Sequence, residues 1–365
     1  RGSNTAIGYA AAMNVGYGRN NTAIGVNAML GASSAAGSIN SCGYAQTATT
    51  ITCTSNATIN TDQRVTGTDI AEGTYVTAIT GGYGSVTSFV ISQATTNASG
   101  GTLAGQTLDF YQTNADDCVA IGASALGAIT TGDFNTAVGY AAGAATTTGA
   151  RNVFVGASTA PTNTTGSYNT GVGGRGSDNY NVLNSNTSGA QLTALGAGAL
   201  SRNVDGNDNT AIGAYSLGRN TTSDNNTAVG RSALAASTSA NNTAVGFQAV
   251  GVGVLTGGSN VVMGYGAGLN ATGMSNSVFV GNQAGGLGVV AGADNVCVGS
   301  AAGYDLTTGV SNVLIGRAAG TNLTEARDNI AIGHGALGAA VATDSYNVAI
   351  GTNALGAQTS NADYC

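Results

Sequence analysis

Few side chains in this 365-residue chain are of the types that perform chemistry, and they are scattered. His334 is the only histidine, and Asp116-Asp117 is the only pair of adjacent acidic residues. Glycoside hydrolysis needs two carboxylates facing one substrate, whereas Asp and Glu are sparse here and fall mainly in sequence typical of turns. We therefore expect that the chain is not an enzyme and that it has no catalytic and no cofactor-binding residue.

One oxygen-rich segment is a weak candidate for calcium. Asp205 and Asp208 lie in the run Asp-Gly-Asn-Asp-Asn, and carboxylate and amide oxygens are the ligands that Ca²⁺ prefers. The spacing does not match an EF-hand loop, and the same residue types are common in any turn. Asp205 and Asp208 are therefore the only metal-ligand candidates, and no other metal is expected.

The five cysteines define the candidate disulfides. Cys42 and Cys118 lie at the two ends of a segment that lacks the repeat described below, so a bridge between them would close its neck. Cys42–Cys53 is the competing pair, and three free buried thiols are the third alternative. Either bridge would indicate an oxidising, extracellular compartment. Cys297 is interpreted as a small apolar residue and Cys365 as unpaired.

Asn-x-Ser/Thr sequences are numerous, as chance alone would produce in a chain rich in Asn and Thr. Each is a candidate glycosylation site if the chain is secreted. The candidates are Asn20, Asn56, Asn97, Asn163, Asn186, Asn220, Asn225, Asn241, Asn270 and Asn322.

The composition excludes several classes of protein. Charged residues make up 7% of the chain, the net charge is −7, and all the cationic residues are single, scattered Arg, which argues against nucleic-acid binding. The sequence contains no run of about 18 apolar residues, so we expect no membrane span. A hydrophobic content of 42%, with 59 Gly and one Pro, argues against disorder and for an ordered fold with a neutral polar surface. The chain begins inside a repeat, so we expect a processed or partial chain.

A repeat of the form Asn-Thr-Ala-Ile/Val-Gly organises the chain. Its spacing is 17 residues from Gly8 to Gly25, and the copies from Gly122 onward keep this spacing to within one residue, apart from a single longer interval. This period is too short for a pair of helices and fits one coil of a β-solenoid, with two short strands and two turns. The repeat glycines are Gly8, Gly25, Gly122, Gly139, Gly156, Gly173, Gly196, Gly213, Gly230, Gly246, Gly264, Gly281, Gly299, Gly316, Gly333 and Gly351.

The strand before each glycine is apolar on both faces. The residue three before the glycine is β-branched, and the residue one before it is aliphatic or Met, so these two share a face. The residue between them is usually Ala and points to the other face. A thin coil can bury only one of the two faces, which predicts that the second packs against another copy of the chain, in a homotrimer or a filament. The Asn that precedes each strand is expected to bond to neighbouring backbone and to stack into a ladder.

One long segment between Gly25 and Gly122 contains no copy of the repeat. We therefore expect three segments: the start of a β-solenoid (residues 1–41), an inserted small β module (residues 42–117) and a β-solenoid shaft (residues 118–365). Alternating runs at Val76–Thr80 and Val86–Ile91, separated by a Gly-rich turn, predict strands within the insert. An insertion on the flank of a solenoid often carries binding, here of glycans or of a cell-surface receptor.

The repeat resembles two related groups of proteins. It is similar to the head region of trimeric autotransporter adhesins, and more similar to tandem Asn-Thr-Ala-Ile-Gly fibre proteins of bacteriophage tails and bacterial surfaces, through Ala-Leu and Ala-Gly subtypes such as Ala125-Leu126 and Ala142-Gly143. The resemblance covers residues 1–30 and 118–360. It implies an extended structural fibre or adhesin shaft, outside the cell, on a cell surface or a virion.

Overall fold

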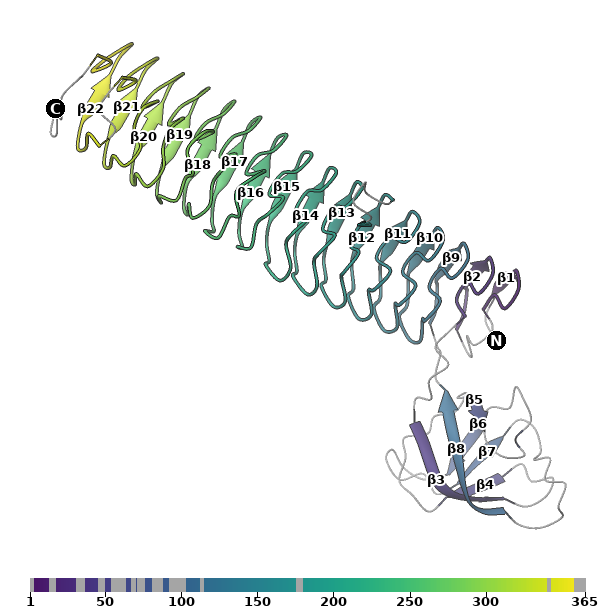
Figure 1. The fold of residues 1–365 in the computed structure, drawn as a ribbon. Coiled ribbons are helices and arrows are strands. Elements are labelled where there is room, and N and C mark those ends of the chain that lie inside the picture. Colours follow the sequence, from purple (N-terminus) through teal and green to yellow (C-terminus); the bar gives the residue numbers. More distant parts are fainter. Residues whose placement is uncertain are drawn as a thin grey trace. The chain divides into compact units, whose positions relative to one another are not determined.

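A computed structural model describes residues 3–12, 18–30, 37–44, 50–53, 64–66, 70, 76–80, 88–91, 103–111, 115–174, 180–339 and 343–357. Within these residues the chain is all-β and contains 22 strands and no helix (Figure 1). The chain divides into two compact units, Arg1–Ala150 and Arg151–Cys365. The strands belong to a 16-stranded parallel sheet and to a 6-stranded antiparallel sheet.

The parallel sheet belongs to a β-solenoid, as the repeat predicts. Each coil of the solenoid contributes one short strand to this sheet. Partners in neighbouring strands usually lie one sequence period apart, as in the pairing of Thr193 with Thr210. In unit 1 its strands are β1 (Thr5–Ile7), β2 (Thr22–Ile24), β9 (Val119–Ile121) and β10 (Thr136–Val138). In unit 2 they are β11 (Val153–Val155), β12 (Thr170–Val172), β13 (Thr193–Leu195), β14 (Thr210–Ile212), β15 (Thr227–Val229), β16 (Thr243–Val245), β17 (Val261–Met263), β18 (Val278–Val280), β19 (Val296–Val298), β20 (Val313–Ile315), β21 (Ile330–Ile332) and β22 (Val348–Ile350).

The insert forms the antiparallel sheet, in the order β5-β8-β3-β4-β7-β6. Its strands run from Gly37 to Tyr111, so the sheet begins before the expected position 42, while Ala115 already bonds to Thr130 of a solenoid coil. The buried side chains of Ile51 and Val65 belong to this sheet. The strands are β3 (Gly37–Tyr44), β4 (Thr50–Cys53), β5 (Arg64–Thr66), β6 (Val76–Thr80), β7 (Ser88–Ile91) and β8 (Leu103–Tyr111).

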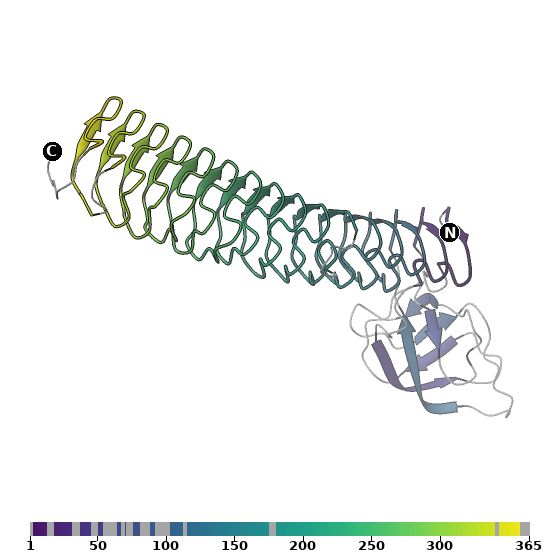
Figure 2. The same cartoon turned by 45° about the horizontal axis from the view of Figure 1, so that its top comes forward.

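The second predicted strand of each coil is absent from the described coils, and a run of turns replaces it (Figure 2). Tyr215 and Leu217 have φ of 61° and 48°, so alternate residues are left-handed and the chain cannot extend. Its N–H groups are nevertheless paired. The amide of Tyr215 donates to the preceding coil, those of Ser216 and Gly218 donate within the coil, and that of Leu217 donates to the following coil. Regular turns therefore satisfy the backbone as completely as a strand would.

The repeat glycine is required by both conformation and space. These glycines have φ between 115° and 140°, which L-residues rarely adopt. A Cβ at Gly316 would also lie 2.5 Å from the carbonyl oxygen of Gly333 in the next coil. The corner of each coil therefore packs backbone against backbone.

The core of unit 2 is filled by two positions that compensate each other in size. The middle residue of the strand and the residue four after the repeat glycine both point inward. Where the strand residue is Ala, as at Ala331, the second position is Leu or Val, as at Leu337. Where the strand residue is larger, the second position is Gly or Ala, and a Cβ at Gly320 would lie 2.7 Å from Cδ2 of Leu314. The Ala-Leu and Ala-Gly subtypes are thus two ways of filling one volume.

The predicted Asn ladder is confirmed. Asn312 shows the pattern: its backbone N–H donates to Oδ1 of Asn295 (3.1 Å), its own Oδ1 accepts the backbone N–H of Asn329 (3.2 Å), and its Nδ2 donates to the carbonyl of Ala326 (2.8 Å). Ser277 takes the same place one coil before Asn295, since its Oγ accepts the N–H of Asn295 (3.2 Å). Each rung therefore satisfies buried backbone groups that lie just outside the strand.

A second ladder of Asn side chains, which was not expected from the sequence, runs from coil to coil along the core of unit 2. Nδ2 of Asn186, Asn203 and Asn220 each donates to Oδ1 of the preceding rung, over 2.8 to 2.9 Å, and Asn163 is the first rung. All four side chains are fully buried. In the next coil the equivalent position is Ser237, and in later coils it is apolar, for example at Ala271, Leu306 and Leu323. Among the described coils of unit 2, this column thus carries amides in one limited stretch.

Exchanging the two core positions tests their size compensation. Gly320→Leu should cost about 1–3 kcal/mol by overpacking, and Leu314→Ala should cost about 2–5 kcal/mol by leaving a cavity. The double variant recreates the pair Ala331/Leu337 of the next coil, so its thermal midpoint, measured by circular dichroism, should exceed that of both single variants. A double variant less stable than either single one would contradict the assignment.

Truncating one rung tests the Asn ladder. Asn312→Ala leaves the N–H of Asn329 and the carbonyl of Ala326 without partners, at a cost of about 1–3 kcal/mol for each group. Amide hydrogen exchange at Asn329 should accelerate strongly. Asn312→Ser should have a smaller effect, because Ser277 already performs this role, and Thr308→Ala at an exposed turn should have none. Unchanged exchange at Asn329 in the Ala variant would rule out the ladder.

Candidate interaction surface

The outer face of the parallel sheet carries two columns of side chains. The middle residue of each solenoid strand after β1 lies inside, so the residues on either side of it point outward, and side chains such as Ile212 (40% exposed) and Met263 (42%) remain accessible. The structure thereby decides which of the two apolar faces is internal. The second column is aliphatic or Met at every strand of the solenoid sheet. Charged residues are absent from both columns of these strands.

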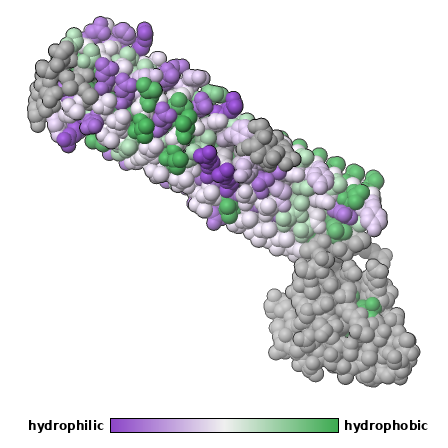
Figure 3. Space-filling model, viewed as in Figure 1, coloured by the Kyte–Doolittle hydropathy of each residue, from purple (hydrophilic) through white to green (hydrophobic). Residues whose placement is uncertain are grey.

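The first column changes character along unit 2. Strands β12 to β16 present Thr there, aligned in register from Thr170 to Thr243. From β17 to β22 the same column is Val or Ile, beginning at Val261 and ending at Val348. The outer face is therefore a Thr-and-aliphatic strip that continues as a wholly aliphatic one. Figure 3 shows apolar (green) side chains gathered in groups on the visible surface of the solenoid.

Aromatic side chains follow several of the repeat glycines and are exposed. Tyr9 is 80% and Tyr140 65% exposed. In unit 2, Phe247 and Tyr265 stack with ring centroids 5.5 Å apart, and the guanidinium of Arg231 lies 5.7 Å from the Phe247 centroid. His334 occupies the same repeat position and is exposed.

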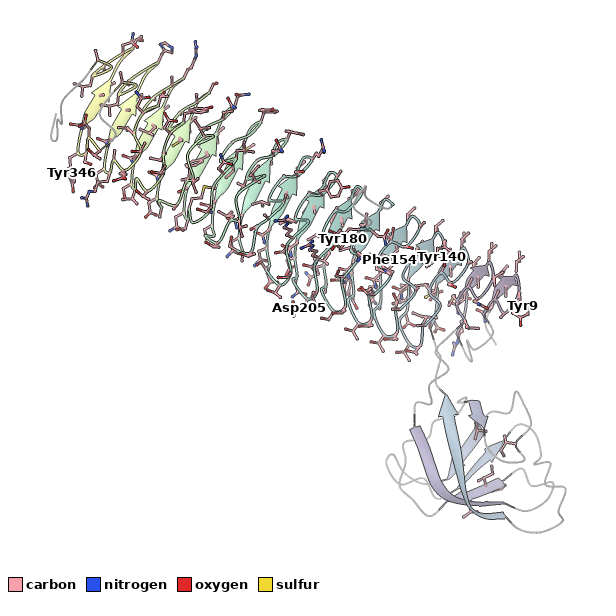
Figure 4. The ribbon with its side chains drawn as sticks, in the orientation of Figure 1. Tyr9, Tyr140, Phe154, Tyr180, Asp205 and Tyr346 are labelled. Atoms are coloured by element: carbon pink, nitrogen blue, oxygen red, sulfur yellow. The ribbon has the colours of Figure 1, made fainter. Side chains whose placement is uncertain are left out.

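The longest coil of unit 2 adds another contact between Arg and an aromatic ring. The spacing from Gly173 to Gly196 is 23 residues, and the added chain includes Tyr180, which Figure 4 labels. The guanidinium of Arg202 lies 5.1 Å from the Tyr180 ring centroid, and its Nη2 donates to the Tyr180 hydroxyl over 3.3 Å. These residues were not expected from the sequence. The repeat frame is the signal that could have found them, since it places Arg202 and Arg219 at the same position of consecutive coils.

The cysteines do not form the predicted neck bridge. Cys118 is buried and free: it occupies an Asn-ladder position, and its Sγ accepts the N–H of Asn135 over 3.4 Å. The Cys42–Cys118 pair is therefore wrong, because the thiol of Cys118 faces the solenoid interior. Cys42 and Cys53 are direct partners in the antiparallel pair β3–β4, a register that suits a disulfide. Cys297 is buried and free, and Cys365 lies outside the described residues.

The acidic candidates lie in turns. Asp116 accepts the N–H of Arg19 (2.6 Å), and Asp117 accepts Nδ2 of Asn20 (2.9 Å), so this pair joins two coils. Asp205 and Asp208 are exposed, and Asp208 has φ of 55°. Among the described residues, no group of three or more His, Cys, Asp and Glu is arranged to hold a metal ion. The calcium prediction gains no support from this geometry.

Three of the glycosylation candidates are wrong. Asn163, Asn186 and Asn220 are fully buried, and their Nδ2 atoms donate inside the core, so no glycan fits on them in the folded chain. Asn20, Asn225, Asn241 and Asn322 are exposed, and Asn270 is half-buried with its Nδ2 donating to Leu287. Asn56 and Asn97 lie outside the described residues.

A scan against protein-family models matches no family, and searches of curated proteins and of solved structures find no match. Within the described residues, no helix has the length and apolar character needed to cross a bilayer. Function must therefore be argued from the fold and from the surfaces of the coils.

Thiol labelling and peptide mapping test the cysteine assignment. Burial raises the pKa of Cys118 to about 11 and that of Cys297 to about 12, so both stay protonated and unreactive at neutral pH. Maleimide should modify them only after unfolding, and mapping after oxidation should find Cys42 linked to Cys53. Since the folded-state pKa values are raised, the stability contributed by the neutral thiols is present below about pH 9 and is lost as pH rises towards 11–12.

A Cys297→Ala variant serves as the control for this experiment. It should reduce the alkaline loss of stability without changing the mapped disulfide. Rapid labelling of Cys118 in the folded protein, or a Cys42–Cys118 peptide, would overturn the assignment.

Proposed function

We propose that this chain is a structural shaft of an extracellular fibre or filament, without enzymatic activity, which carries attachment to a surface or host in the manner of an adhesin or a phage tail fibre. The observation that carries the proposal is the outward aliphatic column, present on every strand of a stack whose neighbouring coils are joined by backbone hydrogen bonds. A cell surface or a virion is the proposed location.

Stacked coils suit a mechanical role. The N–H groups of strands and Asn ladders, and alternate N–H groups of the turns, donate to a neighbouring coil, so each coil is held by its two neighbours. Stability then adds coil by coil, and the length of a shaft can vary without changing its cross-section.

We assign the outer face of the sheet to self-association. Strands about 4.8 Å apart give the twelve strands of unit 2 a strip about 53 Å long. With a width of about 10 Å, its footprint of about 500 Å² approaches the roughly 800 Å² that each partner contributes to a stable interface. A second copy is the occupant that matches the strip, since it repeats apolar rungs at the same spacing and brings no charge to be buried. A homotrimer and an open filament both place this face at the interface.

The insert supports an alternative function. Most of the expected insert, residues 42–117, lies in the segment from Gly37 to Tyr111, which forms its own antiparallel sheet, separate in strand order from the solenoid. A separate module of this kind suits a glycan-binding function carried on a tail fibre.

Charged substitutions on the outer face test self-association. Native mass spectrometry and negative-stain microscopy should find oligomers or filaments of the unmodified chain at micromolar concentration. Ile315→Lys/Ile332→Lys should weaken association at least about 100-fold, because unpaired ammonium groups would be buried. Thr308→Lys/Asn322→Lys adds the same charge at exposed turns and should assemble normally. A monomeric unmodified chain, or equal effects of both variants, would overturn the proposal.

A further inference from the structure

Two arginines stand in one column on the surface of unit 2. Arg202 and Arg219 are 17 residues apart, the spacing that separates the paired strands β13 and β14, so they lie one coil apart at about 4.8 Å rise. Both side chains are exposed. The chain has only ten cationic residues, so two adjacent guanidinium groups are an unusual concentration of positive charge on a protein of net charge −7.

The arginines differ in how they are held. Arg202 is positioned by Tyr180, through the ring contact at 5.1 Å and the hydrogen bond at 3.3 Å. These contacts use one edge of the guanidinium and leave other N–H donors free to bind. Arg219 has no side-chain partner among the described residues. In contrast, the exposed Arg231 lies over Phe247, on a different column of the solenoid.

No acidic side chain neutralises the pair within the described part of the chain. Asp205 is the nearest described acid in sequence to Arg202, and it forms no ion pair with either arginine. The two guanidinium groups on neighbouring coils repel each other, and an anion bound between them would be attracted to both and offset that repulsion. The arrangement thus favours an anionic group held between two planar forks.

Neutral polar groups lie on the preceding coil. Ser185 precedes Arg202 by 17 residues and occupies the same column. Asn181 and Asn184 are half-buried, and Nδ2 of Asn181 donates to Oδ1 of Asn184 over 3.0 Å. Hydroxyl and amide groups of this kind match the hydroxyls of a sugar.

We propose that Arg202 and Arg219, with Tyr180 as the positioning residue, form a binding site for an acidic polysaccharide. A carboxylate or sulfate ester lies between the two guanidinium groups, and the sugar hydroxyls contact Ser185, Asn181 and Asn184. The net negative charge of the chain disfavours nucleic acid, which needs an extended basic surface. The site belongs to the shaft rather than to the insert, and it does not depend on self-association of the outer sheet face.

Binding to four polymers at low ionic strength tests the site in the full chain: dextran sulfate, polygalacturonic acid, neutral dextran and single-stranded DNA. We expect binding to one or both acidic polysaccharides, weakened by salt, and none to dextran. Arg202→Ala and Arg219→Ala should each lower affinity at least about ten-fold, the usual loss of a charged hydrogen bond. Arg202→Lys and Arg219→Lys keep the charge but lose the fork, so they should bind with intermediate affinity.

Three controls separate this site from binding elsewhere on the chain. Arg231→Ala removes another exposed arginine and should bind normally, and Tyr180→Phe keeps the ring while removing the hydrogen bond, so its loss should be smaller than that of Arg202→Ala. A chain lacking residues 37–111 should retain binding, since Gly37 and Phe110 are strand partners and the deletion removes the antiparallel sheet as a whole. Equal binding of DNA, equal loss in Arg231→Ala, loss on removing the insert, or no binding to any acidic polymer would overturn the proposal.

Discussion

The backbone contact between successive coils is the constraint on which the rest of the structure depends. At the repeat glycine, the chain of one coil lies so close to the next that a Cβ has no room, as at Gly316 against Gly333. This contact fixes the offset between coils, and therefore the register of strands, turns and Asn rungs. Every N–H that leaves a coil at Tyr215 or Leu217 finds its carbonyl only because that offset is constant.

A constant offset also makes each side-chain position a column. Inside, the columns must fill a fixed cross-section, which is why Leu314 is paired with Gly320 and Ala331 with Leu337. Outside, the same rule gathers single residues into continuous surfaces. An aliphatic residue in each strand becomes an apolar strip, and two arginines one period apart in sequence become neighbours. Both proposed interaction surfaces arise in this way from residues far apart in sequence.

The two proposals use different parts of the coil. The outer sheet face offers uncharged rungs at a single spacing, which suits a second copy of the chain. Arg202 and Arg219 lie in the turns instead, next to the lengthened coil between Gly173 and Gly196. A solenoid can accept such an extension without disturbing its stack, because the strand and the repeat glycine of that coil keep their places.

The fixed period of the repeat was sufficient to determine the solenoid, the parallel strands and the Asn ladder, because each follows from one residue recurring at a constant interval. Alternation along the strand likewise separated the two apolar faces. Which face is internal was decided only by the tertiary structure, since it depends on the side towards which the chain turns to close the coil. The same closure replaced the second strand with turns, and it buried Asn163, Asn186 and Asn220, which the sequence alone shows as ordinary sequons. It also placed the thiol of Cys118 inside the solenoid, where it is buried and free, because a residue in the ladder column must point inward.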